Sequence, residues 1–122
     1  MAKILVIDDE PGIRRTLCRL LEAGGYEAAA FENGRGAIRY LEHGAADLLI
    51  TDIFMPEAEG IETIREIRRL CPALPIVAMS GSGGGAIDFL DVAEKFGATL
   101  SLRKPFSRSE LLDVVSGLLA RA

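Results

Sequence analysis

Short apolar segments alternate along this chain with stretches in which apolar residues recur at helical spacing. The apolar segments are too short for helices and are bounded by glycine, proline and acidic residues, which predicts strands. These strands are expected at residues 4–7, 26–31, 47–52, 76–79 and 98–102. A helical pattern follows each of them, with starts expected near Pro11, Asn33, Gly60, Ala86 and Ser107. Strands that alternate with helices in this way form a parallel sheet covered on both faces.

The composition of the strands predicts their order in the sheet. The first, third and fourth expected strands have unbroken apolar centres, which is typical of strands buried on both faces. The second carries Glu27, and the fifth carries Thr99 and Ser101, so these two are expected at the edges. The order 2-1-3-4-5 follows, that of the flavodoxin-like doubly wound α/β fold, here with five helices. Because no linker or repeat interrupts the pattern, residues 1–122 are expected to form a single domain.

Charge and hydropathy exclude several classes of protein. A net charge of −4 argues against unaided binding to DNA or RNA as the function. No segment is long enough to span a membrane, and the apolar run at 4–7 is too short for a signal-peptide core, so a cytoplasmic location is expected. In that compartment Cys18 and Cys71 are expected to be reduced residues in or near the core.

Three carboxylates lie where expected strands end. Asp8 and Asp9 follow the first strand, and Asp52 ends the third. In this fold ligands bind beyond the carboxyl ends of the strands, at the point where the strand order reverses. Carboxylates this close repel one another, which indicates a cation between them, and Mg²⁺ fits all-oxygen ligands best. A single strand-end aspartate is more often a helix cap or a solvated turn residue, but three on adjacent strands favour an ion site.

Two further polar residues are expected at the same edge of the sheet. Ser80 follows the fourth strand, and Lys104 follows the fifth, directly before Pro105. A lysine there can neutralise phosphoryl oxygens, and a serine hydroxyl can donate a hydrogen bond to one. Taken singly, Lys104 is a solvated charge and Ser80 is a loop cap. The ordered set of acid pair, aspartate, serine and lysine indicates a phosphoryl site at Asp52.

The same residues resemble the receiver domain of two-component response regulators, and the match spans essentially the whole chain. The matching pieces are Ile7-Asp8-Asp9-Glu10, Asp52-Ile53-Phe54-Met55-Pro56 with Gly60 following, Ser80, and Lys104-Pro105-Phe106. The resemblance implies a signalling phosphoacceptor rather than an enzyme that turns over substrate. It also implies a histidine kinase or histidine phosphotransfer protein as donor, a downstream protein as target, possible homodimers, and no output domain within this chain.

The resemblance also implies a role for each matching residue. Asp52 would accept the phosphoryl group in a Mg²⁺-dependent reaction, with Lys104 pairing with that group and Ser80 acting as the switch hydroxyl. The metal ligands would be Asp8, Asp9, Asp52 and the backbone carbonyl of Phe54. The bond between Lys104 and Pro105 would be cis.

One position departs from the family pattern. Receiver domains usually have tyrosine or phenylalanine three residues before the lysine, and here that position is Ser101. We therefore expect the phosphorylation chemistry to be preserved while its readout differs. Ser101 also keeps open a receiver-like module that binds partners without phosphorylation. An aspartate-nucleophile phosphatase is a weaker alternative, because such enzymes resemble an Asp-x-Asp pattern on the first strand, whereas Asp8 and Asp9 are adjacent.

The remaining motifs indicate structure rather than chemistry. The glycine-rich segment 81–86 fits a dinucleotide pattern, but it follows the fourth strand and lacks the acidic partner, so a flexible loop is expected. His43 is expected at a solvent-exposed helix end. The pairs Arg14-Arg15 and Arg68-Arg69 are expected on solvated helix faces.

Overall fold

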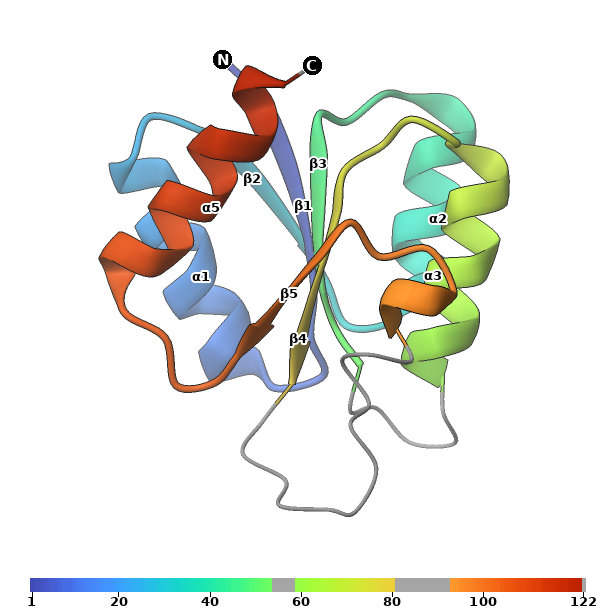
Figure 1. The fold of residues 1–122 in the computed structure, drawn as a ribbon, viewed down its shortest axis with the longest axis horizontal. Coiled ribbons are helices and arrows are strands. Elements are labelled where there is room, and N and C mark those ends of the chain that lie inside the picture. The colour runs from blue at the N-terminus through green and yellow to red at the C-terminus, as the bar shows by residue number, and fades with distance from the viewer. Residues whose placement is uncertain (54–58, 81–92, 122) are drawn as a thin grey trace.

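The computed structural model describes residues 1–53, 59–80 and 93–121, and these form a sheet of parallel strands with helices on both sides (Figure 1). The strands are β1 (Lys3–Ile7), β2 (Glu27–Phe31), β3 (Leu48–Asp52), β4 (Ile76–Ser80) and β5 (Leu100–Arg103). The helices are α1 (Pro11–Ala23), α2 (Gly34–His43), α3 (Glu59–Leu70) and α5 (Arg108–Ala120).

The sheet has the order β2-β1-β3-β4-β5 with every pair parallel, as the strand composition predicted. All residues of β3 and β4 are buried, whereas the edge strands β2 and β5 are partly exposed. Figure 1 shows α1 and α5 on one side of the sheet and α2 and α3 on the other. Alternate side chains of the central strands therefore enter two separate apolar cores. This is the expected flavodoxin-like fold.

The helix starts follow the signals in the sequence. Pro11 occupies the first turn of α1, where its missing N–H leaves no hydrogen bond unmade. The side chain of Asn33 accepts a hydrogen bond from the Gly36 N–H at the start of α2. Ser107 and Glu110 form the predicted capping box of α5, with each side chain accepting from the other residue's backbone N–H.

Most strands differ from expectation by one residue at one end, and larger or more consequential differences concern β5 and α3. β5 begins at Leu100 instead of residue 98, because Gly97 has a φ of 129° and the chain is still leaving a helical turn at residues 93–95. β5 also extends to Arg103, which places Lys104 directly beyond the strand end. Gly60 lies inside the first turn of α3 rather than before it. Most of the helix expected from Ala86, and the whole glycine-rich segment 81–86, fall outside the described residues.

The expectation of solvated arginine pairs is wrong for Arg68. Its guanidinium donates to the carbonyl oxygens of Cys71, Pro72 and Gly97 and to the Thr99 hydroxyl, at 2.8–3.4 Å. It thereby ties the end of α3 to the segment that enters β5. Cys18 and Cys71 are free and half-buried, and His43 is exposed at the end of α2, as expected. Among the described residues no helix combines the length and apolar character needed to cross a membrane.

Candidate functional site

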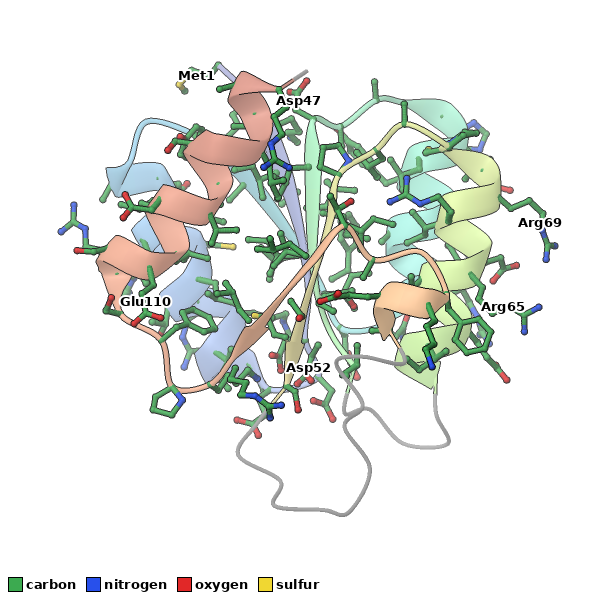
Figure 2. All side chains as sticks on the ribbon, in the orientation of Figure 1. Met1, Asp47, Asp52, Arg65, Arg69 and Glu110 are labelled. Atoms are coloured by element: carbon green, nitrogen blue, oxygen red, sulfur yellow. The ribbon has the colours of Figure 1, made fainter. Side chains whose placement is uncertain are left out.

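Three aspartates meet at the carboxyl ends of β1 and β3. Ile7 pairs with Thr51 across these parallel strands, so the next residues of the two segments, Asp8 and Asp52, lie side by side at the end of the pairing. One carboxylate oxygen from each of Asp8, Asp9 and Asp52 lies within 4.8 Å of the others. Figure 2 shows Asp52 at this edge of the sheet and Asp47 at the opposite edge. The predicted convergence of the acid pair with Asp52 is therefore present.

These carboxylates differ in their access to solvent. Asp8 is fully buried and Asp52 is 5% exposed, whereas Asp9 is exposed. Charged groups this deeply buried are unfavourable unless opposite charge or hydrogen bonds compensate them. The hard oxygen donors and their spacing fit Mg²⁺, which accepts a few carboxylates and keeps water in its remaining positions.

Lys104 supplies positive charge to the two buried carboxylates. Its Nζ lies 3.2 Å from Asp8 Oδ2 and 3.2 Å from Asp52 Oδ2. Burial alone lowers the pKa of the Lys104 ammonium, but the charges of Asp52 and Asp8 together outweigh it, so the pKa is raised. The lysine is therefore charged at neutral pH and places positive charge beside both buried carboxylates.

The chain around Lys104 links the lysine to the end of β4. The backbone N–H of Lys104 donates to the carbonyl oxygen of Ser80 at 2.7 Å, and Ser80 is 4% exposed. Ser80 thus lies at the same sheet edge as the aspartates, as predicted. The peptide bond between Lys104 and Pro105 is cis, which the family resemblance implied. Phe54, whose carbonyl was expected as a metal ligand, lies outside the described residues.

Arg14 belongs to this region, although the sequence indicated a solvated helix face for it. Its Nη1 donates to the backbone carbonyl oxygen of Asp8 at 2.7 Å. A signal for this position existed: Arg14 lies three residues before Leu17 and seven before Leu21, both buried, and therefore on the inward side of α1. The neighbouring Arg15 is exposed, as expected.

The hydroxyl of Ser101 is bonded outside the cluster of Asp8, Asp9 and Asp52. Its hydroxyl donates to Glu94 Oε2 at 2.6 Å, in the segment that precedes β5. The position that usually holds an aromatic ring in receiver domains therefore carries a polar link between β5 and a helical turn.

The fold and this site define a class: a flavodoxin-like α/β domain with an acidic cluster at the point where the strand order reverses. The family model of the response regulator receiver domain matches residues 4–116, and the chain belongs to that family.

Known relatives agree with this assignment. The chain is 34% identical to the response regulator receiver protein CpdR of Brucella abortus (strain 2308), over the full length of both proteins. It is 37% identical to the DNA-binding transcriptional regulator NtrC of Azospirillum brasilense over 97% of this chain, but it spans only 24% of that protein. A crystal structure of a response regulator receiver domain protein from Clostridium thermocellum superposes with a TM-score of 0.89 at 33% identity, covering 99% of this chain and 96% of that one.

Proposed function

We propose that this protein is a phosphoacceptor of two-component signalling and that Asp52 receives the phosphoryl group. The observation that carries the proposal is the position of Lys104 Nζ, at hydrogen-bond distance from both Asp52 and Asp8. A cation held beside a nearly buried carboxylate neutralises charge where a phosphoryl group would arrive. The donor is a phosphohistidine on a histidine kinase or a histidine phosphotransfer protein.

The proposed reaction is a direct transfer. A carboxylate oxygen of Asp52 forms a bond to phosphorus while the phosphorus–nitrogen bond of the donor breaks. The imidazole nitrogen leaves with the electron pair and takes up a proton. Positioning and charge neutralisation lower the barrier of such transfers, and Lys104 would provide part of both by binding a phosphoryl oxygen.

Asp8, Asp9 and Asp52 would hold Mg²⁺, and the backbone carbonyl of Phe54 is proposed as a further ligand. When bound, the ion offsets negative charge on the transferring group and helps to orient it. The spacing of the three carboxylates, with one oxygen of each within 4.8 Å of the others, supports this metal site.

The output is proposed to be a change in protein–protein contact, with Ser80 as the hydroxyl that responds to phosphorylation. Residues 1–122 would act as one receiver domain whose partner is a downstream protein or a second copy of the chain. Direct nucleic-acid and membrane binding are not part of the proposal. A cytoplasmic location is proposed as well, since the histidine kinase or phosphotransfer protein would donate the phosphoryl group there.

The test is incubation with acetyl phosphate and Mg²⁺, followed by intact mass measurement. We expect a gain of one phosphoryl group that is absent in Asp52→Asn and absent with a chelator. Asp113→Asn is the matched control, since Asp113 is exposed on α5, and it should gain the group normally. No gain in the wild type at saturating donor would refute the proposal.

The two alternative functions predict other outcomes in this and related assays. The polar link from Ser101 to Glu94 is the observation that favours a module that binds without phosphorylation. Such a module would gain no mass yet would still retain its partner after Asp52→Asn. Steady release of inorganic phosphate from a simple phosphate ester would instead indicate a phosphatase.

A further inference from the structure

The Arg14 side chain reaches the acidic site through the backbone and not through its carboxylates. Arg14 is half-buried at the start of α1, and its Nη1 lies 2.7 Å from the carbonyl oxygen of Asp8. Within the described part of the chain, no ion pair joins the guanidinium to Asp8, Asp9 or Asp52. The bonded carbonyl belongs to the peptide unit whose nitrogen is that of Asp9. Arg14 therefore restrains the orientation of the peptide that connects the two acidic residues.

Each polar group of Asp8 has a partner. Its backbone N–H donates to the Phe31 carbonyl oxygen at 3.2 Å. Its Oδ1 accepts from the Glu10 N–H at 2.9 Å, and its Oδ2 accepts from Lys104. The bond from Arg14 satisfies the remaining group, the carbonyl, just beyond the end of β1. Asp8 is thus held in one orientation before any ion binds.

Asp9 is held differently. Its side chain is exposed, and its carboxylate accepts no hydrogen bond from the described residues. Its carboxylate oxygen still lies within 4.8 Å of the oxygens of Asp8 and Asp52. Within residues 1–53, 59–80 and 93–121, it is therefore the backbone on either side of Asp9 that restrains where this carboxylate points. On its N-terminal side, that restraint is the peptide bonded by Arg14.

We propose that Arg14 is a positioning residue for the metal ligands, and that it keeps Asp9 directed at the shared cation site. The inference rests on the proposed function, since it assumes that the acidic cluster binds Mg²⁺. Bonding to a carbonyl serves this role well, because the guanidinium then occupies none of the carboxylate oxygens that would bind the ion. Groups that orient metal ligands without touching the metal typically change its affinity by about 10- to 100-fold when they are removed.

Arg14 could affect the site through its charge alone or by positioning the Asp8–Asp9 peptide. These two roles predict opposite changes in Mg²⁺ affinity when Arg14 is replaced by a neutral residue. A guanidinium close to a cation site repels the cation, so losing its charge alone would tighten Mg²⁺ binding. Losing the hydrogen bond would free the Asp8–Asp9 peptide and weaken Mg²⁺ binding. The direction of the change in Mg²⁺ affinity therefore shows whether Arg14 acts only as a nearby charge or as a positioning residue.

The experiment measures Mg²⁺ affinity by isothermal titration calorimetry for the wild type, Arg14→Met, Arg14→Lys and Arg15→Met. Arg15→Met is the matched control, because it removes the same charge from the next residue of α1, which is exposed. We expect Arg14→Met to bind Mg²⁺ about tenfold more weakly than Arg15→Met. Arg14→Lys keeps the charge but not the planar fork, so its affinity should fall between those of Arg14→Met and the wild type.

Two results would overturn the inference: Arg14→Met binding Mg²⁺ as tightly as Arg15→Met, or more tightly. If Arg14→Met does not fold, Arg14→Lys decides, and wild-type affinity in that variant overturns the inference. Urea unfolding in chelator confirms that each titrated variant is folded, and a role in folding alone would lower stability without changing Mg²⁺ affinity. Absence of Mg²⁺ binding by the wild type would instead refute the metal part of the proposed function.

Discussion

Replacing Lys104 with methionine should make the stability of this protein depend on Mg²⁺. Methionine retains most of the side-chain volume but removes the ammonium that contacts Asp8 Oδ2 and Asp52 Oδ2, each at 3.2 Å. Without it, two adjacent carboxylates that are 0% and 5% exposed face each other with no ammonium between them. The folded state then loses free energy that the unfolded chain, with solvated carboxylates, does not lose.

The expected loss is about 2–3 kcal/mol in chelator. Removing one member of a buried ion pair typically costs about 3–5 kcal/mol. The Lys104 side chain is 20% exposed, so solvent screening reduces that figure. For a domain of this size the loss corresponds to a fall in melting temperature of about 10 °C. Mg²⁺ should restore much of the loss, because its binding replaces the missing positive charge and stabilises the folded state by mass action.

The assay is urea unfolding of the wild type and Lys104→Met, each in chelator and in millimolar Mg²⁺. Lys95→Met is the control, since Lys95 is an exposed lysine outside the site. It should change stability little in either buffer. The reasoning is refuted if Lys104→Met matches Lys95→Met in chelator, or if its loss of stability is the same with and without Mg²⁺.

Three more predictions concern pH, packing around two glycines, and the rate of phosphoryl labelling. Since the pKa of Lys104 is raised, its ion pairs contribute fully below the ordinary value of 10.5 and are lost as the pH rises through the raised pKa. The stability difference between wild type and Lys104→Met in urea unfolding should therefore persist from neutral pH to pH 10.5 and shrink at higher pH. Gly60→Ala would place Cβ 2.5 Å from Ile53 Cα and should cost about 1–3 kcal/mol, whereas Gly117→Ala, with open space around it, should gain about 0.5–1 kcal/mol in the same assay. Ser101→Ala should leave the initial rate of acetyl phosphate labelling unchanged, because the Ser101 hydroxyl donates its hydrogen bond to Glu94, outside the acidic site.

The placement of the site was predictable because a parallel sheet is regular. Every strand of such a sheet runs in the same direction, so residues that end strands meet at one edge whatever their separation in sequence. Approximate strand ends and a correct strand order were enough to place Asp8, Asp52, Ser80 and Lys104. The errors of two residues at the start of β5 and one residue at its end had no effect, because Lys104 lies just beyond the strand in either case.

The inward positions of two arginines were not predicted, because their charge in the sequence indicates a solvated surface. Arg14 and Arg68 each belong to an adjacent pair of arginines, a pattern typical of solvated helix surfaces. Both nevertheless lie on the buried side of their helices, and their guanidinium groups bind backbone carbonyls. Every residue has a backbone carbonyl, so the sequence does not show which carbonyl will accept a hydrogen bond. The sequence signal for these contacts was that each arginine lies three or four residues from a buried leucine or isoleucine of the same helix.

The two cations beside the acidic cluster are suited to different tasks under the proposed function. Lys104 binds carboxylate oxygens of Asp8 and Asp52, and a phosphoryl group on Asp52 would compete for the same ammonium. Arg14 binds a backbone carbonyl, which phosphorylation does not change. The lysine can therefore exchange partners during the reaction while the arginine keeps its bond. The Lys104 ammonium, which responds to phosphorylation, is thus separate from the Arg14 guanidinium, which holds the metal ligands. Lys104 can therefore turn towards the phosphoryl group while Asp9 keeps its position.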